Sequence, residues 1–262
     1  MYRRLRRFYV ESALKAEDTL FQLSTRETFH LHRVLRLKAG DVCQIFNREG
    51  QRAQAIVESL SETEGARLRL TQVFPLKQTS LYLKVAQALP QKGKVDNLVE
   101  KAEELGVQEL WLLETERSIV KMKKEAEERA KSRWERIVVE AAKQSGSPTL
   151  LRIEGPFSFE KVMKEKLNPS EEAFLFHPDP SGLAFPKLVE RLKNRKGPLP
   201  SSIFLFFGPE GGFAHDEVSL AESSGVQKVF LGDSTLRLET AFLGVISALR
   251  FLLMHEGDSE AS

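Results

Sequence analysis

Residues that build covalent or metal-linked sites are scarce in this chain. Its 262 residues include a single cysteine, Cys43, so no disulfide can form within it. This composition fits a reducing compartment, and we expect the protein to be cytoplasmic. Cysteine and histidine nowhere show the spacing of a zinc site, so we expect no bound metal.

Long apolar runs are also missing. No segment approaches the roughly 20 apolar residues that a transmembrane helix needs. The arginine-rich start is not followed by the apolar stretch of a secretory signal. We therefore expect no association with a membrane.

Two common nucleotide-binding motifs do not occur. The sequence has no Gly-x-Gly-x-x-Gly, which disfavours a dinucleotide-binding enzyme and the usual open-sheet methyltransferase. It also has no Gly-Lys-Ser/Thr phosphate loop, which disfavours an NTPase.

Positive charge is concentrated at the start of the chain. The whole sequence carries a net charge of +2, but residues 1–74 hold 13 lysines and arginines against 9 acids. The remainder holds 26 against 28. A basic segment beside a slightly acidic one indicates that the first contacts a polyanion.

The pattern of apolar residues predicts two domains. Residues 1–74 read as a compact β unit, with one helix at 29–37 and strands at 42–46, 51–60 and 66–74. A linker follows at 75–79. Residues 80–262 alternate strands with helices, which favours an α/β domain with a mostly parallel sheet. Its expected strands are 81–86, 110–113, 174–176, 203–207 and 229–231, and its expected helices 95–105, 121–144, 183–192 and 241–255.

A glycine-rich loop is the main feature of the second domain. The apolar run 203–207 ends in Gly-Pro-Glu-Gly-Gly-Phe, and a helix with acidic residues in its first turn follows. Glycines between a buried strand and a helix let the backbone approach a ligand. Pro209 makes this loop rigid. A second loop of the same design, at 232–239, follows another buried strand, and we expect the two loops to form a pocket.

These two motifs together resemble the SPOUT-class RNA methyltransferases. The first is Gly-Pro-Glu-Gly-Gly-Phe, and the second is Leu-Gly followed by Leu-Arg-x-Glu-Thr-Ala. Within the class the sequence is most similar to the RsmE family, which methylates N3 of a uridine in small-subunit (16S) ribosomal RNA. The resemblance runs nearly end to end and includes 32–36, 101–107 and Arg117-Ser118. At 147–149 the chain has Ser-Pro-Thr where relatives often carry an arginine. This departure argues against an RNA contact by residues 147–149.

The resemblance implies a fold, a cofactor and partners. It implies a small PUA-like β-barrel followed by a SPOUT trefoil-knot domain, with S-adenosylmethionine bound in the knot. It also implies a homodimer, for which the apolar helix after Thr240 is suited, and ribosomal RNA or the small ribosomal subunit as partner. The cofactor residues that it implies are Leu175, His177, Phe207, Gly208, Pro209, Glu210, Gly211, Leu231, Gly232, Leu236 and Leu238.

Arg237 and Glu239 are the candidate catalytic residues. An arginine here can offset negative charge on a base carbonyl or orient a phosphate. Glu239 can hold Arg237, cap the last helix or act as a base. A purely structural Arg237–Glu239 pair is the competing interpretation, and His177 can equally be a strand-end histidine with a structural hydrogen bond.

Arginines of the first domain are the candidate RNA contacts, because guanidinium groups pair with phosphates. They are Arg3, Arg4, Arg6, Arg7, Arg33 and Arg36. Two other functions stay open: a SPOUT methyltransferase with another RNA target, and a non-catalytic RNA-binding protein of ribosome assembly.

Overall fold

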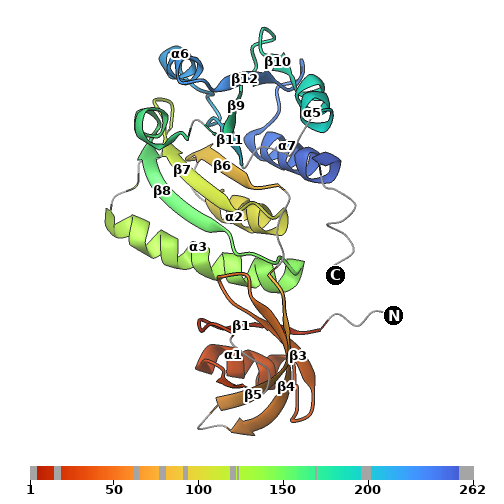
Figure 1. Ribbon diagram of the computed structural model, residues 1–262. Helices are drawn as coiled ribbons and strands as arrows, with labels where there is room; N and C mark the ends of the chain where they lie inside the picture. The colour runs from red at the N-terminus through yellow and green to blue at the C-terminus, as the bar shows by residue number, and fades with distance from the viewer. Residues whose placement is uncertain are drawn as a thin grey trace. The chain divides into compact units, whose positions relative to one another are not determined.

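The computed structural model describes residues 5–14, 19–61, 65–76, 81–90, 94–118, 122, 124–168, 170–195 and 202–253. The chain forms two compact units (Figure 1). The first comprises residues 1–78 and 139–150, and the second comprises 79–138 and 151–262.

A five-stranded sheet builds the first unit. Its order is β1-β3-β4-β5-β2, with β1 parallel to β3 and the other pairs antiparallel. The strands are β1 (Arg7–Tyr9), β2 (Leu20–Gln22), β3 (Val42–Phe46), β4 (Arg52–Ser61) and β5 (Gly65–Phe74). The predicted hairpins are therefore present, and the short edge strand β2 was not predicted.

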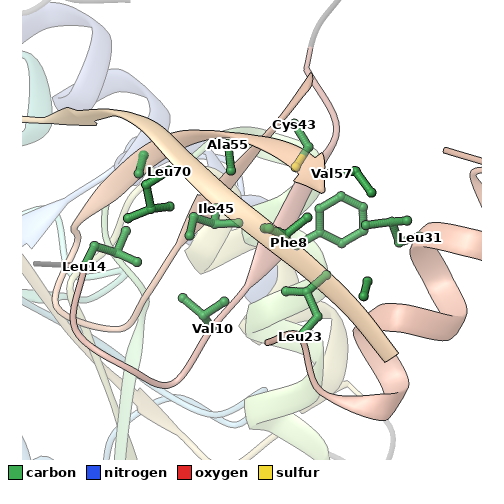
Figure 2. Packing of buried hydrophobic residues seen from close by; sticks show 13 residues of the cluster. Phe8, Val10, Leu14, Leu23, Leu31, Cys43, Ile45, Ala55, Val57 and Leu70 are labelled. Carbon is green, nitrogen blue, oxygen red and sulfur yellow. The ribbon is translucent and has the colours of Figure 1, made fainter. Parts of the chain in front are cut away.

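Alternating side chains form the core of this unit. Along β4 the residues Ala53, Ala55 and Val57 are fully buried while those between them are not, as expected for a strand with one buried face. Figure 2 shows Ala55 and Val57 in one cluster with Phe8 of β1 and Ile45 of β3. The core also encloses Cys43.

One helical segment closes the core. It consists of α1 (Thr25–Phe29) and a π-helical turn, η1 (His30–Val34). It begins four residues before the predicted helix because the Ser24 side chain accepts a hydrogen bond from the Glu27 amide and caps the first turn. Leu31 of η1 is fully buried.

A seven-stranded parallel sheet builds the second unit, in the order β10-β12-β9-β11-β6-β7-β8. The strands are β6 (Leu83–Ala88), β7 (Glu109–Glu114), β8 (Arg152–Ser158), β9 (Glu172–Phe176), β10 (Leu183–Ala184), β11 (Ile203–Phe207) and β12 (Gln227–Phe230). The prediction of an α/β domain with a mostly parallel sheet is confirmed. The central strand β11 is buried at all five residues, which explains its continuous apolar sequence.

Helices connect these strands. They are α2 (Val95–Glu104), α3 (Lys124–Ser145), α4 (Phe159–Lys161) with the π-helical turn η2 (Val162–Lys166), α5 (Phe185–Lys193), α6 (His215–Ser223) and α7 (Leu238–Leu253). The last turns of α3 belong to the first unit. Helix α7 packs against α5 and β11, and α6 packs against β12 (Figure 1).

Two differences from the predicted elements have local causes. The predicted helix at 183–192 begins with the two-residue strand β10, and α5 then starts at Phe185, with Pro186 in its first turn. Strand β8 and the α4-η2 segment were not predicted, because Gly155-Pro156 within β8 reads as a turn.

Two other features are absent from the described residues. None of their helices is long and apolar enough to cross a membrane. Nor do they contain a group of three or more ligating side chains that could hold a metal ion.

Candidate functional site

Three loops meet at one edge of the parallel sheet. His177 follows β9, Gly208 follows β11 and Leu231 follows β12. Strand β9 lies between β11 and β12 and runs parallel to both, so all three loops leave from the carboxyl ends of neighbouring strands. This is where open α/β sheets bind ligands.

A cavity of about 1000 Å³ lies among these loops. Its lining includes both candidate catalytic residues, Arg237 and Glu239. It also includes most of the predicted cofactor residues: His177, Phe207, Gly208, Pro209, Glu210, Gly211, Leu231, Gly232, Leu236 and Leu238. The loops that the sequence predicts to form one pocket are therefore adjacent.

Leu175 is the exception among the predicted cofactor residues. Its side chain is 1% exposed and belongs to the core that contains Phe204 and Phe206. Side chains alternate along a strand, so the next residue, Phe176, lines the cavity instead. The Phe176 ring stacks on Phe207, with centroids 4.8 Å apart.

Side chains from three other segments hold the glycine loop. The buried Gln87 of β6 donates from Nε2 to the Gly208 carbonyl at 3.2 Å. Arg117 donates to the Gly211 carbonyl at 3.0 Å. Glu217 of α6 accepts from the Ala214 and Glu116 amides, both at 2.9 Å. The predicted rigidity of this loop thus has supports that the sequence does not reveal.

One glycine of this loop adopts a left-handed conformation. It is Gly212, with φ of +69°, whose amide closes a turn onto the Pro209 carbonyl at 2.8 Å. The neighbouring Gly211 does not adopt a positive φ. A Cβ at Gly211 would make an ordinary 3.6 Å contact with Arg117. In the second loop Gly232 has φ of +127°, and a Cβ there would meet open space.

His177 is held as a neutral imidazole. Its Nδ1 accepts a hydrogen bond from the Asp179 amide at 3.2 Å, which leaves the proton of the neutral ring on Nε2. Burial, and then the positive charge of Lys228, lower the pKa of His177. Lys228 itself donates to Asp179 at 2.7 Å and fixes the turn. His177 therefore both makes a structural hydrogen bond and lines the cavity.

Lys94 joins two loops of the cavity. It immediately precedes α2, and its Nζ lies 2.9 Å from Glu210 Oε1 and 3.0 Å from Glu239 Oε1. Hydrogen bonds to Glu210 and then Glu239 raise the pKa of Lys94. No sequence pattern singles out Lys94, because its only local signal is a basic residue at the start of a helix.

Glu239 does not hold Arg237. Its pKa is lowered by a hydrogen bond from its own backbone amide and by the one from Lys94, so it is a weak base. Among the residues that the structure describes, none forms an ion pair or hydrogen bond with the exposed Arg237 guanidinium. The structural Arg237–Glu239 pair that the sequence left open is thus not formed.

The candidate RNA contacts differ in exposure. Arg6, Arg33 and Arg36 are exposed, whereas Arg3 and Arg4 lie outside the described residues. Arg7 is only 7% exposed.

The predicted phosphate contact of Arg7 is therefore wrong. Its guanidinium donates to the Ala142 carbonyl at 2.6 Å and to the Ser147 carbonyl at 3.1 Å, and it lies over the Phe46 ring. Arg7 is a buried structural residue that binds the end of α3.

Helix α7 is buried mainly within its own unit. Phe242, Ile246 and Leu249 are fully buried, whereas Phe251 is 71% and Leu252 46% exposed. Leu249 is thus a core residue and not a subunit contact. The exposed apolar surface of the helix lies at its carboxyl end.

Two family matches cover most of the chain. The family described as RNA methyltransferase domain matches residues 77–250, and the family described as RNA methyltransferase PUA domain matches residues 23–70. These matches agree with a PUA-like unit followed by a SPOUT-type unit, and they confirm the predicted fold class.

Two relatives of known name carry the same name. The ribosomal RNA small subunit methyltransferase E of Synechocystis is 32% identical over 231 residues, covering 88% of this chain and 73% of the relative. The protein of that name from Bacillus subtilis is 27% identical and covers 94% of this chain and 96% of the relative.

Solved structures agree with these relatives. A ribosomal RNA small subunit methyltransferase E from Neisseria gonorrhoeae, bound to S-adenosylmethionine, has a TM-score of 0.81 and 26% identity. The match covers 95% of this chain and 98% of that one. A methyltransferase from Legionella pneumophila with bound S-adenosylmethionine has the same TM-score at 25% identity. The sequence resemblance is thereby confirmed, and the chain belongs to the ribosomal RNA small subunit methyltransferase E family of RNA methyltransferases.

Proposed function

We propose that this protein transfers a methyl group from S-adenosylmethionine to N3 of a uridine in small-subunit ribosomal RNA. The observation that carries the proposal is the cavity of about 1000 Å³ at the carboxyl ends of β9, β11 and β12. It has the size of a small-molecule site and combines apolar walls with a few polar groups. Membership of the family supports the same reaction.

The residues of the cavity fit S-adenosylmethionine. Phe176, Phe207 and Leu238 offer apolar surface for the adenosine part. The two glycine loops expose backbone at Gly211 and Gly232, where hydrogen bonds to a ligand require no side chain. When bound, S-adenosylmethionine supplies an electrophilic methyl group on a positively charged sulfur.

Arg237 is the residue that we assign to the acceptor base. Uracil carries negative charge on its carbonyl oxygens once N3 has lost its proton, and an arginine offsets that charge. Arg237 suits this role because it lines the cavity and its guanidinium is exposed. Glu239 serves to anchor the start of α7 rather than to remove the proton, because its pKa is lowered.

RNA binding is assigned to the domain of residues 1–74 and methyl transfer to the domain of residues 80–262. Arg6, Arg33 and Arg36 are exposed in the first domain, which holds the excess of basic residues. Phosphate contacts by such residues supply affinity with little sequence preference. We further propose that the protein acts in the cytoplasm as a homodimer that uses the exposed end of α7.

Nucleoside mapping of ribosomal RNA by mass spectrometry tests the proposed reaction. RNA from a strain lacking the gene should lose 3-methyluridine from the small subunit, and the purified protein should restore it. A normal level of 3-methyluridine in that strain would leave another RNA as the target. Calorimetry with S-adenosylmethionine addresses the remaining alternative, since absence of binding would indicate a non-catalytic RNA-binding protein.

A further inference from the structure

We propose that Lys94 is a positioning residue that holds the two cavity loops together. This inference rests on the proposed function, and it assigns a role to a side chain from outside both loops. Lys94 stands at the start of α2, Glu210 in the glycine loop after β11, and Glu239 in the first turn of α7. Three segments distant in the sequence thus meet at one ammonium group.

Electrostatics explains why these loops need a cation. Both carboxylates contact the same nitrogen, at 2.9 and 3.0 Å, so they lie no more than about 6 Å from each other. Without Lys94 these two like charges would repel, and the two loops would separate. Arg237, two residues before Glu239, would move with the second loop.

The effect of Lys94 is local. Its side chain is 36% exposed and those of Glu210 and Glu239 are 29% exposed, and exposed ion pairs contribute little to global stability. A substitution of Lys94 should therefore change the two loops and the ligand between them, while thermal unfolding stays nearly unchanged.

A matched control is available on the same helix. Lys101 also contacts two glutamates, Glu100 at 3.2 Å and Glu104 at 2.9 Å, and its side chain is 31% exposed. It does not line the cavity. Lys101→Met removes the same kind of ion pair without affecting the loops.

The first experiment measures cofactor affinity by calorimetry. We expect Lys94→Met to weaken S-adenosylmethionine binding roughly tenfold, Lys101→Met to leave it unchanged, and Lys94→Arg to restore most of it. In the triple variant K94M/E210Q/E239Q no charges remain to repel, so the amides of both loops should exchange hydrogen more slowly than in Lys94→Met. Wild-type affinity in Lys94→Met, or no slowing of exchange in the triple variant, would overturn the proposal.

Hydrogen exchange provides a test that needs no cofactor. In Lys94→Met the amides of 208–213 and 232–238 should exchange faster than in the unmodified protein and in Lys101→Met. Unchanged exchange in both loops would refute the positioning role even if the proposed reaction is correct. Conversely, an unmodified protein that binds no S-adenosylmethionine would refute the proposed function, while the exchange result still decides the role of Lys94.

Discussion

His177 makes the cavity sensitive to pH. Because burial keeps its pKa below the ordinary value of 6.5, the folded protein binds a proton there less readily than the unfolded chain. Its contribution to stability is complete above pH 6.5 and is lost as the pH falls through the lower folded pKa. Protonation would also replace the Nδ1 acceptor of the Asp179 amide by a donor.

Cofactor binding should follow this titration. As the pH falls through the lowered pKa of folded His177, an imidazolium would share the cavity with the positively charged sulfur, so affinity for S-adenosylmethionine should fall roughly three- to fivefold. Calorimetry at several pH values measures this. His177→Gln should reduce the pH dependence of cofactor affinity. His215→Gln, at an exposed histidine outside the cavity, should leave that dependence unchanged. An equal slope in the unmodified protein and His177→Gln would assign the effect to another group.

Arg7 should matter for stability and not for RNA. Arg7→Ala removes two hydrogen bonds from a buried cation to the Ala142 and Ser147 carbonyls, and we expect a loss of about 2–3 kcal/mol in the free energy of unfolding. Urea denaturation measures that loss. Arg6→Ala, the change at its exposed neighbour, should cost less than about 0.5 kcal/mol. The structural role of Arg7 would be contradicted if Arg7→Ala were as stable as the unmodified protein and its RNA binding depended less on salt.

The contrast between these two arginines marks a limit of sequence reasoning. Both lie in one basic stretch with aromatic neighbours, and nothing local distinguishes them. Arg7 is buried because its partners come from residues 142 and 147, far along the chain. The same holds for Lys94, whose partners lie in two loops more than a hundred residues away.

Local sequence patterns predicted the strands and loops that form the cavity. The continuous apolar run of β11 corresponds to a strand buried on both faces, and the glycines after it leave at the carboxyl edge of the sheet. Strand β8 escaped prediction because it contains Gly155 and Pro156, which the sheet tolerates at its edge. Strand β2 escaped because three residues carry too little periodicity.

The glycine loop gives a prediction that separates two adjacent residues. Gly212 has a left-handed φ of +69°, a conformation that costs an L-residue about 1–2 kcal/mol. Gly211 does not have a positive φ. Gly212→Ala should therefore weaken S-adenosylmethionine binding roughly tenfold, and Gly211→Ala should change it less than about twofold. Equilibrium dialysis with the radiolabelled cofactor measures both. Equal losses would show that side-chain volume, and not backbone conformation, sets the affinity.

The exposed end of α7 allows a direct test of the proposed dimer. Phe251 and Leu252 are 71% and 46% exposed, so replacing both with serine should leave the core intact and raise the dimer dissociation constant at least roughly tenfold. Sedimentation equilibrium measures the constant. Leu20→Ser, at an exposed leucine of the first unit, is the control. Leu249→Glu would be uninformative, because it places a charge in the core. A monomeric unmodified protein would refute the dimer.

The first unit is built from two separate segments of the chain. The first unit takes up residues 139–150, which contribute the carbonyls that Arg7 binds and Lys143, which pairs with the buried Glu27. Arg26 of the same unit pairs with Glu140. A fragment that ends at residue 78 therefore lacks these partners of Arg7 and Glu27, and we expect it to open far more often than the whole protein.

The reactivity of the Cys43 thiol measures how often the first unit opens. Cys43 is fully buried in the core of the first unit (Figure 2), and burial, followed by the charge of Asp41, raises the pKa of its thiol to about 12. In the whole protein at pH 8 a thiol reagent should thus react only when this unit opens. Fragment 1–78 should react at least roughly tenfold faster, and joining residues 139–150 to it through a flexible linker should restore most of the protection. Because Cys43 is the only cysteine, the signal has a single source. Equal protection in the bare fragment would show that residues 1–78 fold without their distant segment, and that Arg7 and Glu27 find other partners there.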